Sequence, residues 1–202
     1  SGKPPVALRD SPPRLMFDEI DFQPEQYRLP EQPDWQIDLS SAEETVALGQ
    51  RIASGLEAGD VVGLSGQLGA GKTTFVGGLV DALGGEGRTR SPTYTLVNTY
   101  PTEPPVHHVD LYRLETIDDL ESIGYWDYIR ESRGILCVEW LDRLPEAWPG
   151  EGVVVRLEHL TEGRRASIWA KGTIRERLES RLRELGGSPC SGAKSANAES
   201  RH

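Results

Sequence analysis

Apolar residues recur at helical spacing in several segments of the chain. Leu48, Ile52 and Leu56 follow one another every four residues and predict an amphipathic helix over residues 42–57. The same kind of spacing predicts three further helices, over residues 72–83, 117–130 and 174–185.

Apolar and β-branched runs lie between these helices and predict strands. Residues 60–65 predict a short buried strand, and residues 134–138 are wholly apolar, which is typical of a central strand buried on both faces of a sheet. Two further pairs of runs predict hairpins, at residues 94–100 with 106–112 and at residues 153–157 with 166–170. The pattern therefore predicts an α/β fold, with a mixed sheet flanked by helices.

The two ends of the chain lack this periodicity. Half of the 14 prolines lie in residues 1–34, which predicts a disordered leader. Residues 188–202 contain no aromatic side chain and no aliphatic one larger than alanine, and two glycines before them end the last helix. We expect one domain over residues 35–185, followed by a disordered tail over residues 186–202.

Composition narrows the possible functions. With 32 acidic and 22 basic residues the net charge is −10, so the chain lacks the basic surface that strong direct binding of nucleic acid needs. The two cysteines, Cys137 and Cys190, support neither a disulfide framework nor a cysteine-rich zinc site. There is neither an apolar run of the roughly 18 residues that a membrane span needs nor a secretory signal pattern, so we expect a cytoplasmic protein.

A glycine-rich segment between a predicted strand and a predicted helix carries the strongest functional signal. Residues 66–73, GQLGAGKT, match the P-loop pattern G-x-x-x-x-G-K-[ST]. In such a loop the glycines let backbone N–H groups surround phosphate oxygens at a helix N-terminus. Lys72 would reach the β- and γ-phosphates, and the Thr73 hydroxyl would bind Mg²⁺. We therefore expect ATP and Mg²⁺ as cofactors.

A P-loop enzyme also needs a carboxylate near the metal, and two strand ends offer one. Glu139 follows the more apolar strand and is favoured as the metal ligand together with Thr73, whereas Asp110 is favoured as a group that supports the metal ligands from outside or orients water. Together with Lys72 these two carboxylates are the expected catalytic residues. For either carboxylate, capping of a strand end remains the alternative.

The guanine-binding signature Asn-Lys-x-Asp is missing. Neither of the asparagines, Asn98 and Asn197, precedes a lysine, which argues against a Ras-type GTPase.

Four motifs in a fixed order resemble the bacterial TsaE (YjeE) family. They are GAGKTTF at residues 69–75, SPTYTLV at 91–97, HVDLYRL at 108–114 and VEW at 138–140. The resemblance covers about residues 36–185 and implies the ATPase subunit that supports threonylcarbamoyladenosine (t6A) formation in tRNA. It also implies TsaD and TsaB as protein partners, with tRNA reached only through that complex.

The resemblance further implies roles for individual residues. Residues 91–95 would form a switch-like segment near the γ-phosphate, with Asp110 and Trp140 beside the site. Ser41 and Arg164 match positions that contact the nucleotide. The alternatives are that Ser41 only caps a helix, that Arg164 is a solvated charge in a hairpin, and that Trp140 only packs. The expected cofactor-binding residues are Ser41, Gly66, Gln67, Leu68, Gly69, Ala70, Gly71, Lys72, Thr73, Thr74, Thr93, Trp140 and Arg164.

One departure from the family pattern keeps rival functions open. Gln67 stands where the family loop usually has an acidic residue, so a nucleotide-sensing adaptor that binds ATP without needing to hydrolyse it is the first rival. A small-molecule kinase is the second rival, but only Arg88 and Arg90 follow the P-loop helix where an arginine-rich lid would be expected.

Overall fold

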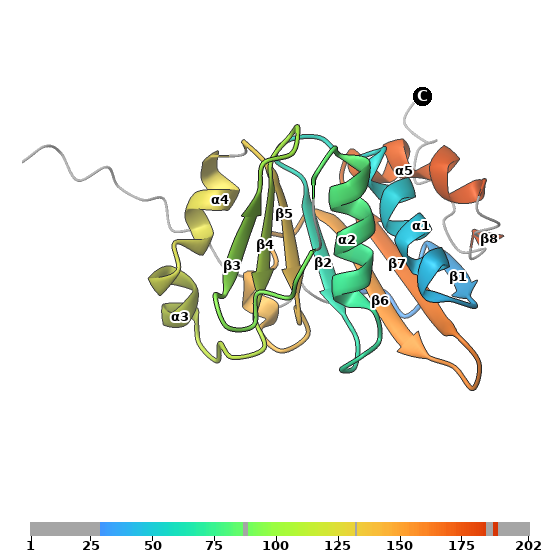
Figure 1. Ribbon diagram of the computed structural model, residues 1–202, viewed down its shortest axis with the longest axis horizontal. Coiled ribbons are helices and arrows are strands. Elements are labelled where there is room, and N and C mark those ends of the chain that lie inside the picture. Colours follow the sequence, from blue (N-terminus) through green and yellow to red (C-terminus); the bar gives the residue numbers. More distant parts are fainter. Residues whose placement is uncertain (1–28, 87–88, 132, 185–187, 190–202) are drawn as a thin grey trace, which may run out of the picture.

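The structure is a computed structural model that describes residues 29–86, 89–131, 133–184 and 188–189 (Figure 1). Its strands form one sheet in the order β3-β4-β5-β2-β6-β7-β1-β8. The strands are β1 (Trp35–Leu39), β2 (Val61–Ser65), β3 (Val97–Tyr100), β4 (Val106–Asp110), β5 (Ile135–Glu139), β6 (Gly152–His159), β7 (Arg164–Lys171) and β8 (Ser188–Pro189). The helices are α1 (Ala42–Ala53), α2 (Lys72–Ala82), α3 (Ile117–Ser122), α4 (Tyr125–Glu131), the 3₁₀ turn η2 (Pro145–Ala147) and α5 (Ile174–Arg183).

The sheet is mixed, as the sequence predicts. Strands β4, β5, β2 and β6 run parallel at its centre, while β3 on one side and β7 and β1 on the other are antiparallel to their neighbours. Both predicted hairpins, β3–β4 and β6–β7, are present. This arrangement places the carboxyl ends of β4, β5 and β2 side by side at one edge, where α/β proteins commonly bind ligands.

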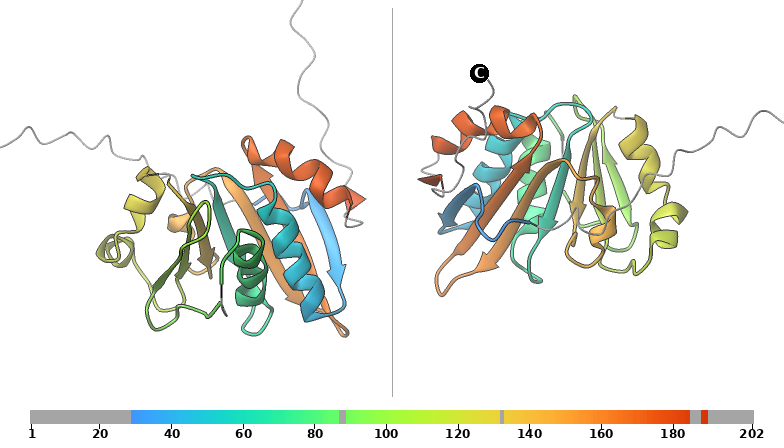
Figure 2. Two further views of the ribbon diagram at one scale, coloured as in Figure 1. Left: turned by 45° about the horizontal axis from the view of Figure 1, so that its top comes forward. Right: turned by 180° about the vertical axis from the view of Figure 1, so that it is seen from behind.

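Two apolar clusters cover the two faces of the sheet. Along β5, Ile135 and Cys137 pack into the cluster that includes α1, α2 and α5, whereas Leu136 and Val138 pack into the one that includes α3, α4 and η2. Figure 1 shows α1 and α2 in front of the sheet with α5 next to α1, and Figure 2 gives the view from behind. The alternation explains why the run is apolar throughout, and it leaves Cys137 as a buried free thiol.

Two predicted helices differ in the structure: one is shorter and one is divided. The first ends at Ala53 rather than near residue 57, because the chain turns at Ser54 and Gly55, where Gly55 lies close against Leu178 of α5. The segment predicted as one helix over residues 117–130 is two helices, because Gly124 between them adopts φ = 67°. A left-handed residue ends one helix and redirects the chain before the next.

The predicted domain contains one strand more than expected, and residues on either side of it contact it. Strand β1, which the sequence analysis did not identify, pairs with β7 and has alternating burial. Residues 29–34 lie within the predicted leader but contact the domain, since Trp169 Nε1 donates to Pro30 O at 2.9 Å. Ser188–Pro189 of the predicted tail pair with β1 as β8. The rest of both predicted ends, residues 1–28 and 190–202, lies outside the described residues, as do Gly186 and Gly187.

Candidate functional site

The loop of residues 66–71 joins β2 to α2 at the carboxyl edge of the sheet. Its first residue, Gly66, adopts φ = 131°, and a Cβ there would lie 2.1 Å from Leu157 O of the neighbouring strand β6. Only glycine fits a position with this backbone and this contact. Neighbouring Ser65 ends β2 within the core, so the loop is anchored on a buried strand.

Helix α2 begins directly after this loop and has no side-chain cap. Gly71 occupies the N-cap position, and the first turn contains no acidic residue. The free N–H groups and the positive end of the helix dipole therefore remain available to an anion. They face a pocket of about 380 Å³, lined by Leu68, Gly69, Gly71, Lys72, Thr73, Thr74, Ser91, Thr93, Tyr112, Glu139 and Trp140.

Lys72 has its ammonium group inside this site. Nζ donates to the carbonyl oxygens of Gly66 and Gln67 at 2.7 and 3.0 Å and lies 3.5 Å from the centroid of the Trp140 ring. Burial lowers the pKa of Lys72, an effect that the nearby carboxylates of Glu139, Asp142 and Asp110 oppose. A cation held in a partly desolvated pocket beside a helix N-terminus favours binding of an anion such as phosphate.

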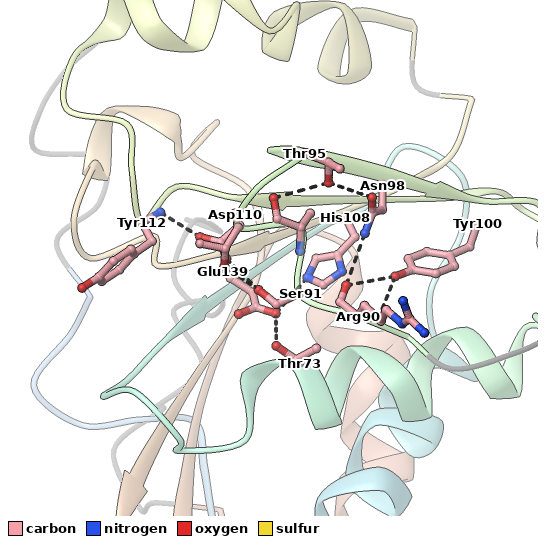
Figure 3. Close-up of polar contacts among 12 residues, drawn as sticks. Thr73, Arg90, Ser91, Thr95, Asn98, Tyr100, His108, Asp110, Tyr112 and Glu139 are labelled. Carbon is pink, nitrogen blue, oxygen red and sulfur yellow. Dashed lines mark hydrogen bonds and ion pairs between the residues drawn. The ribbon is translucent and has the colours of Figure 1, made fainter.

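Glu139, at the end of β5, accepts hydrogen bonds from two elements on one carboxylate oxygen. Thr73 Oγ1 of α2 and His108 Nε2 of β4 each lie 2.8 Å from Glu139 Oε1 (Figure 3). Both His108 and Glu139 are buried. The predicted metal ligands, Thr73 and Glu139, are therefore adjacent in the structure although 66 residues separate them in the sequence.

Asp110, the register neighbour of Glu139 on β4, binds the segment that follows α2. Its Oδ2 accepts hydrogen bonds from Ser91 Oγ at 2.8 Å and Thr93 Oγ1 at 2.5 Å, and its Oδ1 accepts one from Tyr112 N at 2.8 Å (Figure 3). The carboxylate thus holds residues 91–93 against the rim of the pocket. Ser91 and Thr93 of the predicted switch-like segment therefore line the pocket, and their role toward a γ-phosphate stays a prediction.

Trp140 forms one wall of the pocket. Its backbone has φ = 63°, a left-handed conformation that costs a bulky residue about 1–3 kcal/mol and that surrounding contacts must offset. Its ring packs against the Tyr112 ring at a centroid distance of 4.9 Å, with Lys72 on the ring as described above. Trp140 therefore contacts site residues directly, in addition to the packing that the sequence analysis weighed as the alternative.

The other predicted site residues fall into two groups. Leu68, Gly69, Thr74 and Thr93 line the pocket, whereas Gly66, Gln67 and Ala70 shape the loop without being among the pocket-lining residues. Ala70 is buried, and its carbonyl accepts a hydrogen bond from Arg164 Nη1 at 3.1 Å.

Ser41 and Arg164 have structural partners here. The Ser41 hydroxyl accepts from Glu44 N at 3.2 Å as the N-cap of α1, and Arg164 supports the P-loop through Ala70. Their contact with a nucleotide stays a prediction. The Gln67 side chain is exposed and lies outside the set of pocket-lining residues.

Three residues of the site are absent from the cofactor-binding residues predicted from the sequence, although Ser91 belongs to the predicted switch-like segment. Ser91 and Tyr112 line the pocket, and His108 binds Glu139. Ser91 and His108 stand at the start of two of the motifs noted above, and Tyr112 lies within the second, so motif membership was the available signal. Their exact partners depend on which strands are neighbours in the sheet.

The donor set fits Mg²⁺ held jointly with phosphate. No group of three His, Cys, Asp or Glu side chains within the described ranges is placed to bind a metal by itself. A hydroxyl and a carboxylate 2.8 Å apart beside a phosphate loop are the protein ligands that Mg²⁺ uses when water and phosphate supply the rest. The site therefore suits Mg²⁺ bound together with a nucleotide.

Comparison with known proteins agrees with this geometry. The family model for "Threonylcarbamoyl adenosine biosynthesis protein TsaE" matches residues 39–167, which is more than half of the chain. The chain belongs to the TsaE family. The matched residues run from the end of β1 into β7 and include the P-loop, Asp110, Glu139 and Arg164.

Individual TsaE relatives align over most of their own length. The tRNA threonylcarbamoyladenosine biosynthesis protein TsaE of Nostoc sp. is 42% identical over 133 residues, which are 64% of this chain and 81% of the relative. The Aquifex aeolicus TsaE protein is 40% identical over 64% of this chain and 91% of its own. The crystal structure of Bacillus subtilis YdiB matches with a TM-score of 0.58 and 29% identity over 75% of this chain and 93% of YdiB.

The described part of the chain contains the helices α1 to α5 and the 3₁₀ turn η2. None of the helices there is long and apolar enough to cross a bilayer.

Proposed function

We propose that this chain is a Mg²⁺-dependent ATPase that supports t6A modification of tRNA by acting on a TsaD–TsaB complex. The observation that carries the proposal is the convergence of Lys72, Thr73 and Glu139 in one pocket at the N-terminus of α2. Membership in the TsaE family supplies the pathway, because its model and its relatives are described as threonylcarbamoyladenosine biosynthesis proteins.

In this proposal the P-loop and the start of α2 bind the triphosphate. Lys72 exchanges its bonds to the Gly66 and Gln67 carbonyls for phosphate oxygens, which gain a charge-assisted partner. Thr73 and Glu139 would hold Mg²⁺, which when bound neutralises charge on the β- and γ-phosphates. Asp110 orients the attacking water when Ser91 and Thr93 turn from it toward the nucleotide.

The same residues can report the nucleotide state to a partner. Residues 91–95 follow α2 and bind Asp110 through two side-chain hydroxyls, so a γ-phosphate that competes for those hydroxyls changes the shape of this rim. Tyr94 in this segment and Leu68 on the P-loop are both highly exposed, with 90% and 82% of their surface accessible. In this proposal the TsaD–TsaB complex contacts this rim and responds to its shape, and the chain reaches tRNA only through that complex.

The test is ATP hydrolysis by the purified chain, alone and with TsaB and TsaD. Lys72→Ala should abolish hydrolysis, because the loop loses its only buried ammonium group within the described residues. Lys171→Ala is the matched control, since Lys171 is exposed at the far end of β7, and it should leave turnover unchanged.

Two outcomes would redirect the proposal. ATP binding without hydrolysis, even with both partners, favours the nucleotide-sensing adaptor that Gln67 left open. In that case Glu139→Gln should still bind ATP, join the complex and support modification in a depleted strain. If Lys72→Ala restores t6A in such a strain as well as the wild-type chain does, the ATPase role is wrong.

A further inference from the structure

A buried histidine on β4 contacts the carboxylate that would bind the metal. His108 is fully buried, its Nε2 lies 2.8 Å from Glu139 Oε1, and its Nδ1 has no hydrogen-bond partner among the described residues. An ionised carboxylate can only accept hydrogen bonds, so Nε2 carries the proton in this contact. With Nδ1 as an unprotonated nitrogen, the ring avoids burying a second N–H without an acceptor.

The surroundings leave His108 with this single polar contact. Its register neighbours are Cys137 on β5 and Asn98 on β3, whose amide bonds Thr95 and Arg90 instead, and the Tyr100 ring lies at a centroid distance of 6.3 Å. Figure 3 shows His108 pointing from β4 toward Glu139, between the strands and α2. Neither ring nitrogen has another hydrogen-bond partner among the described residues, so the Nε2 N–H holds Glu139 Oε1 in this position.

Thr73 and His108 both donate to Glu139 Oε1, but metal binding would change only the bond from Thr73. Thr73 is itself an expected metal ligand, so its hydroxyl is drawn into the metal site when Mg²⁺ and nucleotide bind. His108 comes from a strand behind the carboxylate and lies outside the set of pocket-lining residues. Its hydrogen bond is therefore compatible with both the free and the metal-bound arrangement.

We infer that His108 is a positioning residue that orients the Glu139 carboxylate for metal binding, an inference that rests on the proposed function. Hydrogen bonds behind a metal ligand fix its direction, and their loss typically lowers metal affinity by about 10- to 100-fold. His108 touches neither phosphate nor metal in this arrangement. It acts through Glu139, and its removal should affect only what depends on Mg²⁺.

The experiment measures ADP affinity by titration calorimetry, once in EDTA and once in saturating Mg²⁺, so hydrolysis does not enter. His108→Leu removes the donor at similar size and should reduce the Mg²⁺-dependent gain in ADP affinity by about 10-fold or more. Its ADP affinity in EDTA should match that of the wild-type chain. His108→Gln places an amide N–H near the original Nε2 position and should retain most of the gain.

A neighbouring histidine provides the control. His107 points to the other side of β4, where its ring packs against Tyr128 at a centroid distance of 4.6 Å. His107→Gln should therefore leave the Mg²⁺-dependent gain at its wild-type value. If His108→Leu does not fold, as thermal unfolding will show, His108→Asn replaces it, because its amide is too short to reach Glu139.

The outcomes separate this inference from the proposed function. A wild-type chain that fails to bind ADP, or binds it equally with and without Mg²⁺, counts against the proposed function itself. A wild-type gain that persists in His108→Leu or His108→Asn overturns the positioning role alone. The role is equally overturned if His108→Gln loses as much as His108→Leu, since shape rather than the N–H would then matter.

Discussion

Single residues around the phosphate loop satisfy one another's hydrogen bonds. The Lys72 ammonium binds two loop carbonyls, the Thr73 hydroxyl binds Glu139, and Ser91 binds Asp110. The N–H groups at the start of α2 are free for a nucleotide, but these side-chain donors must give up their present partners to bind it. The net gain per exchanged bond is therefore modest, and affinity should depend on the added charge–charge interactions and on Mg²⁺.

One buried hydroxyl far from the loop offers a stability prediction at the same scale. Tyr125 is fully buried, and its Oη donates to Ala147 O at 2.6 Å, while burial raises the pKa of its hydroxyl. Tyr125→Phe keeps the ring but leaves the Ala147 carbonyl without this donor. We expect a loss of about 1–3 kcal/mol in the free energy of unfolding, measured in urea.

Tyr128→Phe is the control for that loss. Tyr128 is only half-buried and packs its ring on His107, so removing its hydroxyl should change stability by less than about 0.5 kcal/mol. Equal losses for the two variants would show that the Tyr125 hydrogen bond does not contribute as the structure suggests.

The site illustrates which residues sequence reasoning can reach. Residues 66–74 are contiguous, so spacing alone predicted that they form the loop after β2 and the start of α2. The contact of Glu139 with Thr73 followed from the general rule that a strand-end carboxylate lies beside a P-loop. The His108 contact did not, because it depends on β4 and β5 being neighbours in parallel register, which no local pattern specifies.

At the scale of elements, close packing of α1 against α2 depends on missing side chains. A Cβ added at Gly49 would lie 2.2 Å from Phe75 O, and one at Gly78 would lie 2.1 Å from Val46 O. The two helix backbones therefore approach each other through their glycines. Because α2 carries the N-terminus that lines the pocket, this contact also fixes the phosphate site relative to β1 and α1.

Adjacent glycines of α2 allow a matched test of this helix contact. Gly78→Ala forces the helices apart and should lower the free energy of unfolding by at least about 1–3 kcal/mol. At Gly77 a Cβ would meet only Thr89 side-chain atoms, at 3.7 and 3.8 Å, which are ordinary contact distances. Gly77→Ala should therefore be neutral or stabilise by up to about 1 kcal/mol through helix propensity.

Chemical denaturation of both variants gives the answer. If Gly78→Ala is as stable as Gly77→Ala, the helices are not in the close contact described here. A reduced affinity for ADP in Gly78→Ala alone would further show that the helix contact places the phosphate site.

Element boundaries show the limit of periodic patterns. The pattern of apolar residues over 117–130 predicts one uninterrupted helix, yet the structure has two helices, one on each side of Gly124. The capping box of Thr116 and Asp119 begins the first of them, and Gly124 ends it. Strand β1 was missed because it is short and follows a proline-rich segment, although its alternation of buried and exposed residues is regular.

At the scale of the whole molecule, the segment before β1 is bound to β7 and to the start of α5 by side-chain and backbone contacts. Asp34 N donates to Ile168 O at 2.8 Å, and the Asp34 carboxylate accepts from Ala170 N at 2.9 Å. The same carboxylate forms an ion pair with Arg175 at the start of α5. These bonds join residues more than 130 positions apart, so they hold the segment before β1 against β7 and α5.

Asp34→Ala tests how much these contacts stabilise the fold, with a charge-matched variant as the control. The variant leaves Ala170 N–H and the Arg175 guanidinium without their partner and should lower the free energy of unfolding by about 1–3 kcal/mol. Asp38→Ala removes the same charge from the more exposed pair with Arg165 and should cost only about 0.2–1 kcal/mol. Urea unfolding of both variants is the measurement. Equal costs would mean that residues 29–34 do not hold the fold together.

The sequence by itself determined the class of fold, the phosphate loop and the family, because each of these depends on local periodicity or on contiguous motifs. The tertiary structure decided which side chains share the pocket: it brought His108 to Glu139, placed Ser91 and Thr93 on Asp110, and seated Arg164 against the loop. The physical reason is that each of these contacts joins segments that are distant in the sequence, and which segments become neighbours is set by the packing of the whole sheet.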